Sequence, residues 1–357
     1  MRRALLILAA LFAALVGYLL FWPTGLTPEG WRPSPAPPLT GAYAKNDALA
    51  GVKAVALSLV GPESIAIDKD GRIHTGLADG SIVRLAADGT HIERLASTGG
   101  RPLGVELDAL GRLVIADAER GLLRLEGTVL SVLAAEHEGK RFRFADDLAI
   151  AADGTIYFTD VSLRFGLDDY IMDLLDHRPT GRLFAWREGG KLEVVADRLY
   201  FANGVALAPD GSYALVAETS SYRVTRIWLH GERRGQREVF VDNLPGFPDN
   251  ITWSSTRRAF WIALGAPRDA TLDALAPFPF LRNVIARLPP QLRPKPRRHV
   301  FALAFDEQGK IIANLQHENI AAYAPLASVL ESGGMLWLGS LERDGVGRIA
   351  APALATP

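Results

Sequence analysis

Two short polar clusters, each leading into a strand-like run, hold the side chains best suited to chemistry. Asn203-Gly204 precedes the run VALA, and Asp249-Asn250 precede ITWS about one repeat length later. Carboxylate and amide oxygens at equivalent points of successive β-units can converge on one axis and ligate a hard cation. The sequence therefore predicts a metal site with oxygen ligands, with Ca²⁺ as first choice and another divalent cation as the alternative. Asn203-Gly204 alone is also a common turn dipeptide, so a purely structural role stays open for it.

A repeated unit would supply the elements that hold these side chains. It consists of a short apolar run, a turn similar to D-x-x-G and a second apolar run. Its six copies are SIAIDKDGRIHTG from Ser64, GVELDALGRLVIAD from Gly104, DLAIAADGTIYFTD from Asp147, GVALAPDGSYALVAE from Gly204, and the degenerate ITWSSTRRAFWIAL from Ile251 and SVLESGGMLWLGS from Ser328. Repeats of this length with glycine-linked strands are typical of propellers with four strands per blade. The chain is therefore predicted to be all-β, a six-bladed β-propeller.

Two irregularities in the repeats lead to further predictions. The last copy is followed only by VGRIA, so VKAVALSL from Val52 should supply its fourth strand and close the ring. Residues 266–299 interrupt the fifth blade with a helical pattern, and we expect them to form a cap over one propeller face. A second interpretation adds a membrane contact, through the apolar residues of this insert and the basic cluster Arg293, Lys295, Arg297 and Arg298.

Residues 1–22 are predicted to be an N-terminal transmembrane helix. The stretch from Ala4 to Trp22 is free of charge and long enough to cross a bilayer. Arg2 and Arg3 should stay cytoplasmic, which makes the segment a single-pass signal anchor and places the propeller on the periplasmic or extracytoplasmic side. A cleaved signal peptide is the alternative.

The remaining chain divides into a linker and one large domain. The proline-rich residues 23–40 should form an extended tether, and the propeller should span residues 41–357. A formal net charge of −1 gives no electrostatic basis for binding nucleic acid. Cysteine is absent, which excludes disulfides and cysteine-ligated zinc. The seven histidines show no metal-ligand spacing and are expected in the core or on the surface.

Three longer segments resemble a known family. They are FADDLAIAADGTIYFTDVSLRF, YFANGVALAPDGSYALVAET and LPGFPDNI, and the resemblance covers roughly residues 61–349. The segments are similar to those of the strictosidine synthase-like proteins, especially the adipocyte plasma membrane-associated protein group. That family belongs, with the gluconolactonases and paraoxonases, to one superfamily of six-bladed propellers. The N-terminal apolar segment and the insert after Leu264 also match the group.

The resemblance implies a set of metal ligands. In calcium-dependent members the ion lies at the centre of the ring, and the matching positions here are Glu63, Asn203, Asp249 and Asn250. A further ligand, usually Asn, corresponds to Asp146. The resulting three carboxylates around one axis would need a divalent cation to relieve their repulsion, or one carboxyl with a raised pKa. Asp147, which follows the last of these positions, is either a general base or a structural hydrogen-bonding residue.

Two positions depart from the catalytic members of the superfamily. Leu103 stands where the paraoxonases have a histidine beside a Pro-x-Gly turn, so no histidine base is expected there. Ala327 stands where strictosidine synthase itself has the glutamate that drives condensation of an amine with an aldehyde, so we expect no Pictet–Spengler chemistry. Arg101, in the same turn as Leu103, either binds an anionic group in the pocket or has a structural role.

The leading hypothesis is a membrane-anchored, metal-dependent hydrolase of lactones or aryl esters, acting on a small-molecule ester or lactone. The metal would act as a Lewis acid in the central channel. The alternative is a non-catalytic, membrane-anchored scaffold in which a structural calcium ion pins the blades and the top face binds a protein, lipid or sugar. The absent histidine favours the scaffold, and the retained set of polar channel residues favours the enzyme.

Overall fold

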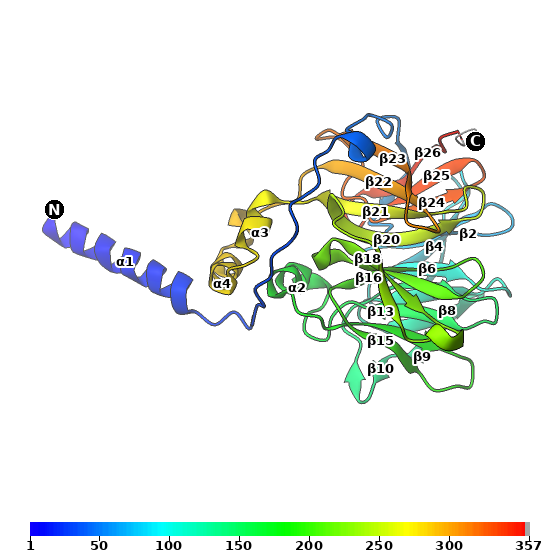
Figure 1. Ribbon diagram of the computed structural model, residues 1–357, viewed down its shortest axis with the longest axis horizontal. Helices are drawn as coiled ribbons and strands as arrows, with labels where there is room; N and C mark the ends of the chain where they lie inside the picture. The colour runs from blue at the N-terminus through cyan, green and yellow to red at the C-terminus, as the bar shows by residue number, and fades with distance from the viewer. Residues whose placement is uncertain (354–357) are drawn as a thin grey trace.

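Six four-stranded antiparallel sheets form the blades of a propeller in the computed structural model, which describes residues 1–353 (Figure 1). The innermost strands contact one another in the cyclic order β2, β6, β12, β16, β20, β24 and back to β2, so the ring is closed. The predicted all-β, six-bladed fold is therefore confirmed. Positions 354–357 of the predicted domain 41–357 lie outside the described residues.

The blades follow the chain from inside to outside, with one exception in the last blade. They are β2–β5 (Ile65–Ile67, Ile73–Gly76, Ser81–Leu85, Glu93–Ser97), β6–β9 (Pro102–Leu107, Leu113–Asp117, Gly121–Glu126, Val129–Ala134), β12–β15 (Ala145–Ile150, Ile156–Asp160, Gly181–Trp186, Glu193–Leu199), β16–β19 (Ala202–Leu207, Tyr213–Glu218, Arg223–Trp228, Arg237–Val241), β20–β23 (Gly246–Ser254, Ala259–Pro267, His299–Asp306, Ile311–Glu318) and β24–β26 (Ser328–Ser332, Met335–Gly339, Asp344–Ala350) with β1 (Lys53–Val60). A separate hairpin, β10 (Glu136–His137) and β11 (Lys140–Arg141), projects between the second and third blades.

The repeated D-x-x-G turn has a clear local cause. In the first blade Asp68 Oδ1 accepts hydrogen bonds from the backbone N–H groups of Asp70 and Arg72, and Gly71 has a φ of 77°. Asp108 and Gly111 form the same turn in the second blade. The aspartate satisfies the turn backbone and the glycine accepts the left-handed conformation, so the turn joins the first two strands of the blade.

The ring is closed by a strand from the N-terminal side of the domain, as predicted. β1 pairs with β26, and Lys53 lies opposite Arg348 while Val55 lies opposite Val346. The last sheet therefore joins both ends of the propeller chain in one blade. This pairing removes the open edge that three strands alone would leave.

Apolar clusters between neighbouring blades hold the ring rigid. One cluster combines Val114 and Leu122 of the second blade with Phe158 and Phe184 of the third, and the two phenyl rings stack at 5.3 Å. Each such fully buried side chain contributes roughly 2 kcal/mol through its removal from water. The inner strands are thus fixed relative to one another, and so are the side chains that they carry into the channel.

The three shorter α-helices of residues 1–353 lie on one face of the propeller, between the blades and the long N-terminal helix (Figure 1). The helices are α1 (Arg2–Phe21), α2 (Tyr170–Asp176), α3 (Ala270–Leu275) and α4 (Pro279–Arg287), with short 3₁₀ turns η1 (Gly41–Tyr43), η2 (Leu167–Asp169), η3 (Thr219–Ser221), η4 (Gly231–Arg233) and η5 (Pro290–Leu292). The helical insert between β21 and β22 of the fifth blade is confirmed. α2 comes from the third blade and was not anticipated; we call α2 and residues 266–299 together the cap.

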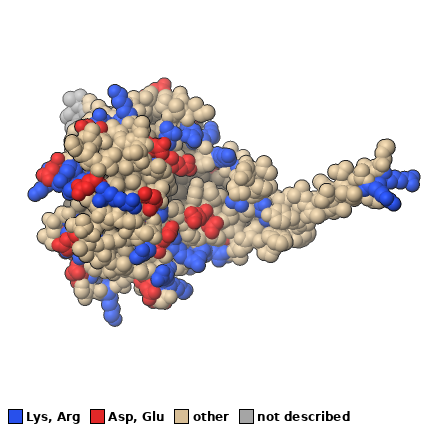
Figure 2. Space-filling model, turned by 180° about the vertical axis from the view of Figure 1, so that it is seen from behind, with Lys and Arg blue, Asp and Glu red and all other residues tan. Residues whose placement is uncertain are grey.

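Helix α1 is the one helix in residues 1–353 that is long and apolar enough to cross a membrane. None of its residues is buried against the rest of the protein. It has no charged residue after Arg3, and Figure 2 shows it as an almost uncharged stalk with basic side chains at its free end. Length and composition fit an anchor and a signal sequence equally, so both alternatives stay open.

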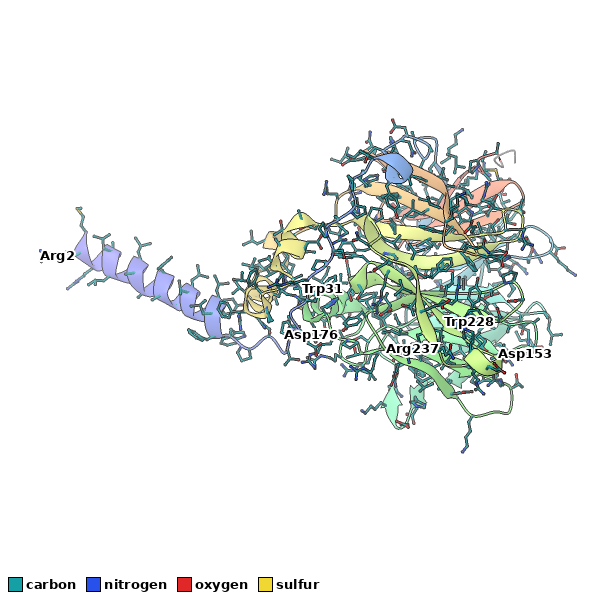
Figure 3. The ribbon with its side chains drawn as sticks, viewed as in Figure 1. Arg2, Trp31, Asp153, Asp176, Trp228 and Arg237 are labelled. Atoms are coloured by element: carbon teal, nitrogen blue, oxygen red, sulfur yellow. The ribbon has the colours of Figure 1, made fainter. Side chains whose placement is uncertain are left out.

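Residues 23–40, which we call the strap, have no regular secondary structure and are fixed to the cap. Thr27 N–H donates to Asp176 Oδ1 at 2.7 Å, and Trp31 N–H donates to the carbonyl oxygen of Ala276 at 3.2 Å. In Figure 3 the labelled Trp31 and Asp176 both lie at the junction of cap and propeller. The strap therefore ties α2 to the fifth-blade insert.

Candidate functional site

Irregular pairing aims the polar side chains of three inner strands at the channel. Asp146 and Asp147 lie between the paired residues Ala145 and Leu148 of β12, where the register with β13 shifts. The same shift surrounds Asn203 in β16 and Asp249-Asn250 in β20. A β-bulge leaves residues unpaired and changes the direction of their side chains. The third, fourth and fifth blades thus each have polar residues at an irregular position of the inner strand.

Glycines at these bulges allow the inner strands to approach at backbone contact. A Cβ on Gly104 would lie 2.7 Å from Asp147 Cα, and one on Gly204 would lie 2.6 Å from the backbone N of Ile251. Gly204 does not have a positive φ, and Asn203 lies within strand β16. The interpretation of Asn203-Gly204 as a simple turn is therefore wrong: the glycine makes room for the neighbouring strand.

All five predicted metal ligands have an oxygen without a hydrogen-bond partner among the described residues. The atoms are Glu63 Oε2, Asp146 Oδ2, Asn203 Oδ1, Asp249 Oδ1 and Asn250 Oδ1. Glu63 precedes β2, so the set comes from four blades. An unpaired buried polar group costs about 1–3 kcal/mol, so these five oxygens fit residues that would bind a cation.

This donor set fits a calcium ion, because carboxylate and amide oxygens are the ligands that calcium prefers. Within residues 1–353, no three His, Cys, Asp or Glu side chains are grouped closely enough to form a metal cluster by themselves. A site here would combine the carboxylates with the amide oxygens of Asn203 and Asn250.

Burial and mutual repulsion raise the carboxyl pKa values in the channel. Burial raises the pKa of Glu63 to about 8 against the opposing charge of Arg101, and Asp147 adds to the increase. The pKa of Asp146 is also raised, first by burial and then by Glu63 and Asp249. Burial and the charge of Glu63 likewise raise the pKa of Asp249, while the adjacent Asn203 opposes the shift. A cation would reverse this balance and favour the ionised forms.

Asp147 is buried and is partly used by the fold. Its Oδ2 accepts a hydrogen bond from the backbone N–H of Val205 at 2.9 Å, which ties β12 to β16. Burial raises the pKa of this carboxyl to about 7. Asp147 is not among the residues that line the pocket, whereas Glu63, Asp146, Asn203 and Asp249 are.

A pocket of about 480 Å³ lies between the channel and the cap. Its floor is polar and includes four of the predicted ligands together with Arg101, whereas its walls are mainly apolar. The wall residues include Phe144, Leu167, Ile171, Leu174, Phe201, Phe247, Leu272, Leu275, Ile285 and Leu341. Figure 2 shows a recess between the propeller and the narrower cap. The pocket thus has several polar residues at its base and an apolar surface above them.

Arg101 combines the two roles that the sequence left open. Its Nη2 donates to the carbonyl oxygen of Gly61 at 2.9 Å, which links the first and second blades. Its Nη1 has no partner among the described residues, and the side chain lines the pocket floor. One guanidinium edge is therefore structural, and the other can donate to a ligand oxygen.

His177 is a pocket residue that the sequence did not indicate. Its ring stacks on Trp31 of the strap at 4.1 Å and on Tyr200 at 4.7 Å. Burial lowers the pKa of this imidazole to about 3, so it is neutral at physiological pH. No local pattern could have revealed this position, because both aromatic partners are distant in the chain.

Leu103 and Ala327, the two positions that depart from catalytic relatives, are both buried. Leu103 is fully buried in an apolar cluster with Phe144 and Phe201. Ala327 is buried, and its carbonyl oxygen accepts the backbone N–H of Asn250. The nearby Glu331 is paired with Arg257 at 2.8 Å and holds the fold instead. Neither position supplies an acid or a base.

Two family profiles match separate parts of the propeller chain. The profile of the strictosidine synthase family matches residues 146–232, and that of the strictosidine synthase-like N-terminal region matches residues 41–85. The chain is 33% identical over 303 residues to Protein STRICTOSIDINE SYNTHASE-LIKE 6 of Arabidopsis thaliana, covering 82% of this chain and 80% of the relative. It is 35% identical over 343 residues to the adipocyte plasma membrane-associated protein of Salmo salar, covering 88% and 81%.

Solved structures share the fold at low sequence identity. A gluconolactonase from Xanthomonas campestris aligns with a TM-score of 0.62 and 18% identity, over 84% of this chain and 89% of that one. The calcium-binding protein regucalcin from Agrobacterium tumefaciens aligns with a TM-score of 0.57 and 14% identity, over 83% and 93%. These similarities show a common propeller architecture.

Proposed function

The chain belongs to the strictosidine synthase-like family, and from that premise we propose that it is a membrane-anchored hydrolase of lactones or aryl esters that holds calcium in its central channel. The family resemblance noted from the sequence is thereby confirmed. Membership alone does not define an activity, because one propeller architecture hosts many functions. The proposal therefore depends on the site.

One observation carries the proposal: five side chains from four blades each have a buried oxygen without a hydrogen-bond partner among the described residues. Four of these residues form the floor of a pocket of about 480 Å³, so a ligand in the pocket would meet them directly. Glu63, Asp146, Asn203, Asp249 and Asn250 would hold the ion. A bound calcium ion would polarise an ester or lactone carbonyl and stabilise negative charge on its oxygen.

Arg101 of the floor would position the substrate, and Asp147, the chain neighbour of the floor residue Asp146, would move a proton. Arg101 can donate through Nη1 to an oxygen of the substrate, and the apolar wall excludes water from the rest of the pocket. Asp147 is our candidate general base. Because Oδ2 is bound to the N–H of Val205, Oδ1 is the atom that would accept a proton from water.

Metal content of the purified full chain in detergent tests the ligand set. We expect about one divalent ion per chain, and we expect Asp249→Ala and Glu63→Ala each to remove it, since each deletes an anionic ligand. Asp70→Ala, at an exposed turn carboxylate, is the matched control and should keep the ion. Unchanged metal content in both channel variants would contradict the assignment.

Hydrolysis tests the chemistry. We expect weak, chelator-sensitive cleavage of aryl esters or lactones and no condensation of tryptamine with secologanin. Asp147→Asn should lower kcat while the metal content stays the same, because this residue is not in the proposed ligand set. Strong condensation by the unaltered protein would contradict the proposal.

A non-catalytic scaffold remains the second candidate, and two observations favour it. Leu103 replaces the expected histidine, and Asp147 already bonds to Val205. In a scaffold the ion would only pin the blades. Chelation would then lower thermal stability, and no ester or lactone would be cleaved with or without calcium.

We further propose that α1 is an uncleaved anchor with the propeller on the periplasmic or extracytoplasmic side. Arg2 and Arg3 flank one end of the helix, and the positive-inside bias would keep that end in the cytoplasm. The protein should stay with membranes in high salt, and protease added to intact spheroplasts should digest the propeller. A soluble chain that starts beyond Trp22 would show a cleaved signal peptide instead.

A further inference from the structure

Helix α1 is attached to the cap at its C-terminal end. Arg287 of α4 donates from Nε to the carbonyl oxygen of Trp22 at 2.6 Å and from Nη1 to that of Leu19 at 3.0 Å. Tyr18 donates its hydroxyl to the carbonyl oxygen of Arg287 at 3.1 Å. The last carbonyls of a helix have no intrahelical partner, so these bonds cap α1 with a side chain of α4. The cap is therefore attached at the C-terminal end of the apolar helix α1.

The outer surface of the cap is apolar next to this attachment. Phe278, Phe280, Leu281 and Leu292 are 53%, 54%, 39% and 66% exposed. The adjacent end of α1 exposes further aromatic side chains, so the apolar surface continues from the helix onto the cap. Basic residues follow in the sequence at 293–298, and of these Arg293, Lys295 and Arg297 also reach the edge of the pocket. Exposed apolar side chains with basic neighbours, continuous with a membrane helix, fit the interface of a bilayer.

The inner surface of the same cap lines the pocket. Ile285 of α4 and Leu272 and Leu275 of α3 belong to the pocket wall, and Trp31 of the strap lies with them. Thus α4 touches α1 on one side and the pocket on the other. Figure 1 shows the same arrangement, with α3 and α4 between α1 and the propeller. A single layer of helices, about 10 Å thick, separates the pocket from the anchor.

We propose that the outer surface of the cap lies in the lipid interface and that the pocket receives an amphiphilic ester or lactone from the bilayer. The polar group of this ligand reaches the floor formed by Glu63, Asp146, Asn203, Asp249 and Arg101, and its aliphatic chain lies along the apolar wall towards the cap. The ester or lactone in this statement rests on the proposed function. The amphiphilic character rests on the polarity of the pocket and on its place beside α1.

The absence of cysteine makes the position of the cap directly measurable. Single variants Leu281→Cys, Leu292→Cys and Leu110→Cys of the full chain can each carry one environment-sensitive fluorophore in lipid nanodiscs. Leu110 is 76% exposed and lies at the opposite end of β6 from the pocket. Lipids with a quencher in their headgroup region should quench the two cap labels and spare the label at position 110. Equal quenching at all three positions, or none at the cap, would overturn the proposal.

Ligand binding is tested without hydrolysis by a brominated long-chain alcohol, because bromine quenches tryptophan. Bromododecanol should quench wild-type protein in nanodiscs more than the Trp31→Phe variant, and bromoethanol should bind about tenfold or more weakly. Leu272→Glu should weaken the long-chain ligand, and Leu110→Glu should not. Equal quenching of wild type and Trp31→Phe would overturn amphiphile binding. Quenching without cleavage of any ester would support the pocket's ligand class and count against the proposed hydrolase.

Discussion

The floor and the roof of the pocket are built in different ways. Bulges in inner strands form the floor, where glycines such as Gly204 allow backbone contact between blades. Three segments far apart in the chain form the roof: the strap, α2 and the insert of the fifth blade. Side chains bonded to backbone carbonyls hold these segments together. The floor is therefore part of the propeller core, and we expect the roof to loosen without loss of the propeller.

Arg282 shows how the roof is assembled. Its Nη1 donates to the carbonyl oxygen of Glu29 in the strap at 2.7 Å, and its Nη2 donates to that of Leu174 in α2 at 3.1 Å. One buried guanidinium thus joins all three roof segments. Asp176 of α2 accepts the N–H of Thr27 in the strap, and its other carboxylate oxygen forms an ion pair with Arg164 at 2.8 Å. The contrast suggests that the floor determines the chemistry and the roof determines which molecules reach it.

The largest effect is expected from closing the gap between inner strands. Gly204→Ala would place a Cβ against the backbone of β20 and should cost about 3 kcal/mol of unfolding free energy. Gly51→Ala is the matched control, because its Cβ would meet only Ile349 Cδ1 at 3.6 Å. Chemical denaturation gives both values. A loss below about 1 kcal/mol for Gly204→Ala would show that the floor is not rigid.

Calcium should stabilise the floor by a similar amount. At a free concentration about a hundred times the Kd, one bound ion adds roughly 2.7 kcal/mol to the unfolding free energy. The gain should disappear in Asp249→Ala, which lacks one proposed ligand, and persist in the control Asp70→Ala. Thermal unfolding with calcium and with chelator measures the difference. An equal gain in Asp249→Ala would place the stabilising ion elsewhere.

A smaller and more local effect is expected from the roof. Arg282→Met keeps most of the side-chain volume and removes the bonds to the strap and α2, which should loosen the roof by about 2 kcal/mol. Hydrogen exchange and limited proteolysis should increase in residues 23–40, while the main unfolding transition moves little. The control is Arg178→Met, at a more exposed strap contact. If the whole propeller lost as much stability as in Gly204→Ala, the distinction between floor and roof would fail.

The most gradual effect concerns pH and His177, because it is spread over several pH units. Because burial lowers the pKa of His177 to about 3, the unfolded state binds more protons than the folded state between about pH 6.5 and 3. Stability contributed by the neutral ring should therefore fall with decreasing pH, by at most about 1.4 kcal/mol per pH unit. His177→Phe keeps an aromatic ring between Trp31 and Tyr200 and should reduce this slope. The same slope in wild type and variant would contradict the prediction.

Much of the fold could be predicted because its signals are local. Asp68 and Gly71 form a complete turn within a few residues, and the turn recurs in later blades. The count of repeats then gave the number of blades, and the missing last strand pointed to β1. The polar positions Asn203, Asp249 and Asn250 were also visible, since they lie next to the recurrent apolar runs VALA and ITWS.

The roof and the exact surroundings of the floor were decided by tertiary structure. The contacts of Trp31 with His177, and of Arg282 with Glu29 and Leu174, join residues between 108 and 253 positions apart. No local pattern encodes such partners, because their proximity exists only after the blades have closed. The sequence alone determined a repeated strand pair, an apolar N-terminal helix and a set of oxygen donors. Ring closure decided which donors face one channel, and long-range side-chain bonds decided what covers it.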